Sequence, residues 1–358
     1  MPSLKEIKGR INSISSTLAI TSAMKMVAAA KLQKAQMAIQ NMLPYERRLY
    51  SMLVDLMGAM NISAAASEDG SVRGSGSAER GFDQSGDLLS LSNRHDLAGM
   101  DGAYSLMAQR EVRKVAIVAF ASNSSLCGAF NSNVIREATA VINEYRASGL
   151  RDSDIVVYSV GRKMAEAMRK LGFPSPADFT KMSDSPSYEA ASALAQELLD
   201  GFVSGRFDKV ELVYNHYKST SSQPTTRQTY LPLSLADATA DLQAGKIADS
   251  ASESDTNRGA EPVGAPVVRQ GSPTTEDLIV EPSKEALIAT LLPKVIRLRI
   301  FTTLLDSAAA EHAARTVAMQ LATDNGNDLL QELTLEYNKG RQQKITSEIL
   351  DLVGGSMQ

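Results

Sequence analysis

The stretch LQELTLEYNKGRQQKITSEILDLVGG, residues 330–355, ends the longest helical pattern in the chain. Its large apolar residues recur at steps of three, four or multiples of these, as along one face of an α-helix. They are Leu330, Leu333, Tyr337, Ile345, Ile349 and Leu352. The pattern begins near residue 282, and a helix of that length is too long for an ordinary globular core. It therefore predicts a second long helix as its partner.

The N-terminal sequence predicts that partner. Apolar residues there alternate steps of three and four, the spacing of a coiled-coil seam, at Leu4, Ile7, Ile11, Ile14 and Leu18. Ser3 and Glu6 have the spacing of a capping box. A helix over residues 3–60 would be roughly 85 Å long at ~1.5 Å per residue, so it must protrude. Pro44 predicts a kink or a brief break, and Pro293 predicts a kink in the C-terminal helix.

The middle of the chain has a different pattern. Apolar runs of strand length at 115–120 and 155–160 alternate with helical spacing, and two further strand patterns follow at 210–215 and 227–235. The last two are close enough in sequence to pair antiparallel. Strands that alternate with helices predict a mainly parallel sheet covered on both faces. We therefore predict a Rossmann-like α/β domain inserted between the two arms of a long antiparallel coiled coil.

Composition marks the boundaries between these parts. The chain divides into an N-terminal shaft helix (1–61), a flexible linker (62–111), the α/β domain (112–236), an acidic flexible loop (237–281) and a C-terminal shaft helix (282–358). The linker is rich in Ser, Gly, Ala and Asp with little periodicity. Residues 241–281 carry eight acidic side chains against three basic ones.

Overall composition excludes several classes of protein. The net charge is −4 over 358 residues, so no global basic field indicates nucleic acid binding. Residues 1–50 carry eight Lys and Arg against two Glu, which indicates either an acidic partner or a solvated helix face. A single cysteine, Cys127, excludes an intrachain disulfide. No apolar run approaches ~18 residues and no signal pattern precedes the first helix, so we predict no transmembrane segment and a place on the cytoplasmic side.

No enzyme motif is recognisable. The loop 122–130 follows the first strand, where Rossmann-like folds bind ligands, but it holds one glycine rather than a Gly-x-Gly-x-x-Gly or phosphate loop. A structural loop is favoured. Cys127 as a nucleophile would need a histidine partner, and the three histidines, His95, His216 and His312, show neither a triad nor metal-ligand spacing. We predict no catalytic residue, no cofactor and no metal.

Two segments of the C-terminal helix remain ambiguous. The polar cluster at 338–344 places Gln342 and Thr346 one turn apart, beside Arg341. This cluster is either a solvated stretch or a polar contact patch for a partner. Asn325-Gly326 is typical of a turn, although Gly costs only about 1 kcal/mol relative to Ala inside a helix and long-range packing can override that cost.

Five segments together carry a family resemblance. Residues 20–32, ITSAMKMVAAAKL, resemble the N-terminal signature of the gamma subunit of F-type ATP synthase. EHAARTVAM (311–319), ATDNG (322–326) and LEYNKGRQQKITSEI (335–349) resemble its C-terminal blocks, and LCGAFN (126–131) resembles its first strand-to-helix loop. The match covers both ends and the α/β core in the family's order.

The resemblance implies a rotor shaft of bacterial type. In the family, the two long helices turn inside a ring of α and β subunits, and the α/β domain lies at the foot with epsilon, the c-ring and possibly delta. Proton flow turns the shaft, and ATP chemistry belongs to the β subunits. It follows that the chain would be a non-catalytic subunit of the H+-transporting two-sector ATPase, peripheral to the cytoplasmic face of the inner membrane. The linkers look longer than the short bacterial form and lack the paired cysteines of the chloroplast type's redox switch.

The resemblance also implies which residues touch partners. Met24 and Lys25 lie in the N-terminal block, and Arg341, Gln342 and Thr346 match the polar group that meets the β-subunit catch loop. The apolar tip that turns in the upper bearing is matched by Ile349, Leu350, Leu352 and Val353. Two alternatives compete with this hypothesis: a nucleotide-binding α/β protein with helical arms, and a coiled-coil scaffold. The scaffold leaves the inserted sheet unexplained.

Overall fold

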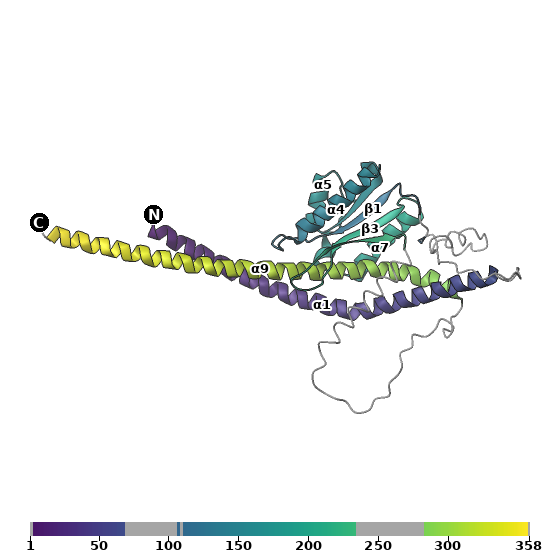
Figure 1. The fold of residues 1–358 in the computed structure, drawn as a ribbon, viewed down its shortest axis with the longest axis horizontal. Coiled ribbons are helices and arrows are strands. Elements are labelled where there is room, and N and C mark those ends of the chain that lie inside the picture. Colours follow the sequence, from purple (N-terminus) through teal and green to yellow (C-terminus); the bar gives the residue numbers. More distant parts are fainter. Residues whose placement is uncertain (1–2, 69–105, 108–109, 234–282, 357–358) are drawn as a thin grey trace, which may run out of the picture.

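The computed structural model describes residues 3–68, 106–107, 110–233 and 283–356, and it shows a rod of two long helices with an α/β domain on one side (Figure 1). The rod consists of α1 (Leu4–Glu68) and α9 (Lys284–Ser356). The domain between them contains β1 (Val115–Phe120), α4 (Phe130–Ala147), β2 (Ile155–Val160), α5 (Arg162–Lys170), α6 (Thr180–Asp184), α7 (Tyr188–Val203), β3 (Lys209–Asn215) and β4 (Thr225–Leu231). Among the described residues, no helix combines the length and the apolar character needed to cross a membrane.

The two helices of the rod run antiparallel. Thr302 on α9 donates its hydroxyl hydrogen bond to Glu46 on α1 at 3.0 Å, and farther along Thr323 donates to Thr21 at 3.1 Å. Residue numbers therefore fall along α1 as they rise along α9. On the predicted seam of α1, Ile7 is buried and the other four residues are half-buried, while most of their neighbours are exposed.

The helix ends and prolines differ in part from the prediction. The Ser3 hydroxyl accepts a hydrogen bond from the Glu6 amide at 3.3 Å, but the Glu6 carboxylate pairs with Arg10 rather than closing the capping box. The predicted break at Pro44 is wrong, because α1 is continuous through it. A proline removes one hydrogen bond from a helix, and packing along a long partner can compensate for that loss. In α9 the helix likewise continues through Pro293.

The linker boundaries also shift. The helix α1 continues to Glu68, past the predicted boundary at residue 61, and Leu106 is buried in the core of the α/β domain although the linker was expected to reach residue 111. The rest of the predicted linker lies outside the described residues, apart from positions 107 and 110–111, as does the predicted acidic loop at 237–281.

The sheet has the order β2-β1-β3-β4. Strand β1 pairs parallel with β2 and β3, whereas β4 pairs antiparallel with β3, as the sequence predicted. All six residues of β1 are buried, which fits its continuous apolar run in the middle of the sheet. The fourth strand begins at Thr225 and ends at Leu231, a few residues earlier than expected.

Different helices cover the two faces of the sheet (Figure 1). On one face, α4 and α5 pack through Val134, Val141 and the fully buried Met164 and Met168. On the other face, α7 packs together with the half of the rod that contains the beginning of α9 and the later part of α1. Ile296 on α9 and Leu53 on α1 belong to the same core as Phe120 in β1. The rod is therefore one layer of the domain, and the domain is fixed to it by a shared hydrophobic core.

Candidate functional site

The C-terminal end of α9 extends past the beginning of α1 (Figure 1). Leu4, the first residue of α1, packs against Gly340, where an added β-carbon would lie 3.2 Å from Leu4 Cδ2. Beyond this point every side chain from Arg341 to Leu350 is exposed. The apolar stripe of the C-terminal helix therefore extends beyond its contact with α1, and α1, the partner helix that the stripe predicted, does not cover Ile345, Ile349 and Leu352.

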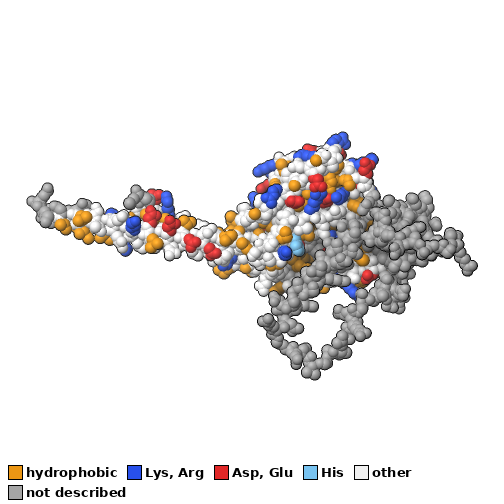
Figure 2. All heavy atoms as spheres, in the orientation of Figure 1, with side chains coloured by type: hydrophobic (Ala, Val, Ile, Leu, Met, Phe, Trp, Pro, Cys, Tyr) orange, Lys and Arg blue, Asp and Glu red, His pale blue; other side chains and the backbone are white. Residues whose placement is uncertain are grey.

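This overhanging end carries an exposed apolar surface, which we call the apolar tip. The tip consists of Ile349, Leu350, Leu352 and Val353, whose exposed fractions range from 51% to 75%, and the nearby Ile345 is 47% exposed. Apolar side chains gather along this end of the rod in Figure 2. Because contiguous exposed apolar surface is costly in water, such a surface indicates a partner.

The predicted polar group lies at the base of the apolar tip. Arg341, Gln342 and Thr346 are all exposed, and the Thr346 hydroxyl donates to the Gln342 carbonyl oxygen at 2.9 Å. Nearby, Lys344 and Glu348 form an exposed ion pair at 3.7 Å. A guanidinium offers several donors in a planar fork that suits carboxylates, so the exposed Arg341 can bind an acidic partner.

Met24 and Lys25 lie farther along the rod, away from the exposed end of α9. Both are half-buried on α1, and the Lys25 ammonium donates to the Gln320 side-chain oxygen on α9 at 2.6 Å. The Gln320 amide in turn donates to the Asp324 carboxylate at 2.8 Å. Gln320 and Arg341 are separated by roughly 30 Å along α9 at ~1.5 Å per residue. The structure therefore does not bring the two predicted contact groups together.

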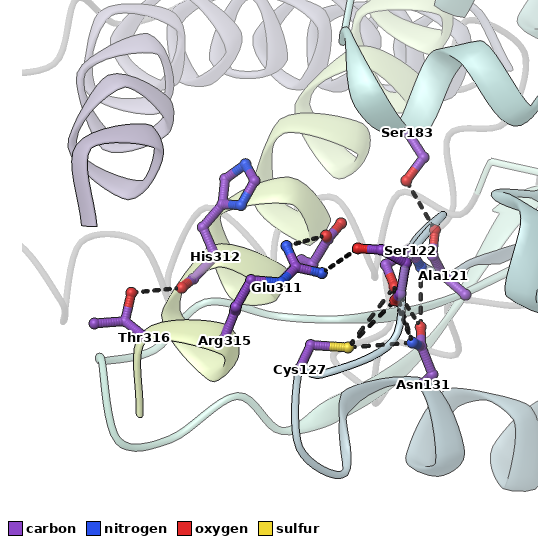
Figure 3. Close-up of polar contacts among 10 residues, drawn as sticks. Ala121, Ser122, Cys127, Asn131, Ser183, Glu311, His312, Arg315 and Thr316 are labelled. Carbon is purple, nitrogen blue, oxygen red and sulfur yellow. Dashed lines mark hydrogen bonds and ion pairs between the residues drawn. The ribbon is translucent and has the colours of Figure 1, made fainter. Parts of the chain in front are cut away.

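A buried ion pair joins α9 to the first loop of the α/β domain (Figure 3). Arg315 binds the Glu311 carboxylate through Nη1 at 2.7 Å and donates through Nη2 to the Ser124 hydroxyl at 2.7 Å. Both charged side chains are nearly covered, at 11% and 10% exposure. Burial raises the pKa of Glu311, and the Arg315 charge opposes this rise. The pair links the rod to the loop by charge as well as by packing.

His312 lies next to this pair on α9. Its Nδ1 atom is buried without a hydrogen-bond partner. Burial, together with the positive charges of Arg315 and Lys31, lowers the pKa of His312 to about 4. The imidazole is therefore neutral at physiological pH, and in Figure 3 it points away from Cys127.

The loop 122–130 satisfies its own polar groups. The Ser122 hydroxyl donates to the Ser124 carbonyl at 2.6 Å, and the Ser122 amide donates to the Asn131 side-chain oxygen at 3.0 Å. Asn131 also donates to the Cys127 sulfur at 3.1 Å. A β-carbon added at Gly128, where φ is +58°, would lie 3.8 Å from the Ala318 side chain on α9. This geometry suits the predicted structural loop, since one side of the loop packs against Ala310 of α9 through Cys127 and Phe130.

Sequence reasoning assigned no role to Glu311 and Arg315. Their spacing of four residues on a helix, acid before base, was a usable signal for an ion pair. Nothing local indicates that the pair is buried or that Ser124 is its third member, because Ser124 lies 191 residues away in the sequence.

Comparisons with known proteins place the chain in a family. A sequence model of the family described as ATP synthase matches residues 3–357. The ATP synthase gamma chain of Phocaeicola vulgatus is 46% identical over 357 residues, covering 100% of both chains. The gamma chain of Bacteroides thetaiotaomicron is 45% identical over the same share, and that of Flavobacterium johnsoniae is 36% identical over 99% of this chain and 98% of its own.

Solved structures share the fold. A chain of the Euglena gracilis mitochondrial ATP synthase, from the OSCP, F1 and c-ring assembly in rotational state 3, gives a TM-score of 0.53 at 18% identity. That match covers 99% of this chain and 93% of the other. A chain of the rotor of the same enzyme in rotational state 1 gives 0.50, covering 96% and 98%. By its full-length match to the family and its identity to these relatives, the chain belongs to the ATP synthase gamma chain family.

Proposed function

We propose that this chain, a central-stalk subunit of an ATP synthase, passes rotation to the catalytic β subunits through the overhanging end of α9. The observation that carries the proposal is that α1 begins opposite Gly340, so α9 continues beyond this position without α1 beside it. Arg341, Gln342 and the apolar tip are thereby exposed on one helix. Such a helix can enter a sleeve of surrounding subunits, where the tip is covered and Arg341 meets acidic side chains.

The rest of the molecule suits a rotor. The antiparallel pair of α1 and α9 would wind as a coiled coil and act as the shaft. The α/β domain shares its core with the beginning of α9 and the later part of α1, so torque applied to the domain reaches the shaft without a flexible joint. The domain would form the foot, in contact with epsilon and the c-ring.

In this function the chain itself performs no ATP chemistry. The loop after β1, where a Rossmann-like fold binds its nucleotide, forms hydrogen bonds within itself and packs Cys127 and Phe130 against α9. Nucleotide turnover would belong to the surrounding subunits. The relatives are bacterial gamma chains, which supports a position on the cytoplasmic face of the inner membrane.

The decisive experiment uses the assembled complex of this chain with its α and β subunits. Arg341→Ala with Gln342→Ala is expected to lower ATP hydrolysis and synthesis severalfold while assembly and folding are unchanged, because both side chains are exposed. Arg136→Ala with Ser132→Ala, on the outer helix α4, is the matched control and should leave turnover unaltered. Full turnover in a correctly assembled Arg341 and Gln342 variant would mean that the patch is only a solvated face.

A second measurement separates the alternatives. Co-purification with α and β subunits is expected, and its failure would contradict the central-stalk function. Isothermal titration of the isolated chain with nucleotide is expected to show no micromolar binding. Clear binding would support the nucleotide-binding α/β protein instead.

A further inference from the structure

The loop between β3 and β4 contacts both helices of the rod. The Tyr217 amide donates to Asp306 Oδ1 on α9 at 2.9 Å, and Gln36 on α1 donates to the Tyr217 hydroxyl at 2.6 Å. The Tyr217 ring packs against the small apolar cluster that contains Leu32 of α1 and Ala309 of α9. A single loop of the α/β domain, residues 216–224, therefore contacts α1 and α9 at the same position along the rod.

Internal hydrogen bonds stiffen this loop. The His216 amide donates to the Pro224 carbonyl at 2.9 Å and closes the base of the hairpin. At the end of the hairpin, Ser219 and Ser222 exchange backbone hydrogen bonds at 3.1 and 3.2 Å, and the Gln223 side-chain amide donates to the Ser219 carbonyl at 2.9 Å. The strands thus present His216 and Tyr217 to the rod in a fixed position, and little entropy is lost in keeping the contact.

Within this hydrogen-bonded set, His216 contacts Asp306. His216 Nδ1 lies 2.6 Å from Asp306 Oδ2, while the other oxygen of the same carboxylate accepts from Tyr217. The His216 side chain is 50% exposed and that of Asp306 only 17%. The imidazole can therefore exchange protons with water, whereas the carboxylate that it faces is largely covered. A protonated imidazole makes a charge-assisted bond to the carboxylate, about twice as strong as a neutral one.

We propose that His216 and Asp306 form a protonation-dependent clasp that holds the β3–β4 loop on the rod. The inference goes beyond the contact with β subunits, since it concerns how the chain's own domain is attached to its shaft. Release of the clasp loosens the loop locally, because the shared core and the Arg315 contact to Ser124 remain.

The direction of the pH dependence follows from the surrounding charges. The hydrogen bond to Asp306 raises the pKa of His216 above its ordinary value of 6.5, while burial and the nearby Lys218 oppose the rise. Asp306 is the charged group from α9 and Lys218 the one from the loop itself, whereas α1 meets the loop through the uncharged Gln36. The clasp is complete below pH 6.5 and is lost as the pH rises through the folded-state pKa.

The first test measures the titration of His216 in the full-length chain by NMR of its imidazole protons, assigned with His216→Gln. The pKa of His216 is expected above 6.5 in the wild type and to fall towards 6.5 in Asp306→Asn. Asparagine keeps an oxygen for the Tyr217 amide and removes only the charge. Asp152→Asn, a carboxylate paired with Arg146 on the outer face, is the matched control and should leave the His216 titration unchanged.

The second test measures attachment of the loop by amide hydrogen exchange of residues 216–224, corrected for the intrinsic effect of pH. In the wild type, protection should fall severalfold between about pH 6 and about pH 9, on either side of the titration. In His216→Gln, protection should stay at the lower level at both pH values. A His216 pKa that does not respond to Asp306→Asn, or wild-type protection that does not change with pH, would overturn the proposal.

Discussion

Gly326 on α9 lies so close to Leu18 on α1 that a β-carbon at Gly326 would stand 2.7 Å from Leu18 Cδ2 and 3.2 Å from Leu18 Cγ. The Asn325-Gly326 pair is typical of a turn, but here it is part of the continuous helix α9. Glycine is less favourable than alanine in a helix by about 1 kcal/mol, but it lets the two backbones approach closely enough for Leu18 to pack. Turn chemistry is overridden at this position by a contact across the rod.

Substitution of two helical glycines should therefore have opposite effects. Gly9 on α1 has open space around it, so Gly9→Ala is expected to stabilise the chain by up to about 1 kcal/mol. Gly326→Ala combines the same gain with an overpacking cost of about 1–3 kcal/mol, so its net effect should be between zero and about 2 kcal/mol of destabilisation. Urea unfolding of the full-length variants measures both. Equal stabilisation at the two positions would mean that Leu18 adapts without cost.

Loss of Arg315 should destabilise the junction between rod and domain strongly. Arg315→Met leaves the buried Glu311 carboxylate without its cationic partner, and breaking a buried ion pair in this way costs about 3–5 kcal/mol. Adding Glu311→Gln removes the stranded charge and should recover part of the loss. Urea unfolding of both single variants and the double variant gives the coupling energy, which we expect to be well above that of an exposed pair. Additive effects would contradict a coupled buried pair.

His312 should make the chain less stable in mild acid. Because its folded-state pKa is about 4, the unfolded chain takes up a proton near pH 6.5 that the folded chain excludes. The unfolding free energy should therefore fall between about pH 6.5 and about pH 4, by at most about 3.5 kcal/mol at ~1.4 kcal/mol per pKa unit. In the His312→Leu variant this part of the pH dependence should disappear, whether or not the substitution changes the stability at neutral pH. A wild type and a variant with the same pH dependence would show that His312 titrates normally.

The apolar tip should matter for turnover and not for folding. Ile349→Ser with Leu352→Ser changes side chains that are exposed in this chain, so its urea unfolding should shift by no more than about 0.5 kcal/mol. In the assembled complex the same change should lower the fraction of correctly assembled enzyme or its ATP turnover. Val203→Ser, an exposed apolar residue at the end of α7, is the control that should leave both unaltered. Normal assembly and turnover of the tip variant would argue against a bearing surface.

Local patterns in the sequence predicted most of the elements. The apolar runs at 115–120 and 155–160 became β1 and β2 with the expected bounds, because a strand of a sheet that is covered on both faces is apolar on both faces. The seam from Leu4 to Leu18 identified the face that α1 buries, because helical spacing alone places those residues on one side. Even the antiparallel pairing of the last two strands followed from their closeness in sequence.

The tertiary structure alone decided how the two long helices are offset. No pattern within α9 shows that α1 begins opposite Gly340, yet this position divides an apolar stripe into a covered half and an exposed tip. The continuity of the helices at Gly326 and Pro44 and the burial of Arg315 likewise depend on residues far away in the sequence. Propensity and periodicity describe one segment at a time. The free energy that overrides them comes from packing between segments, and packing is defined only once the chain has folded.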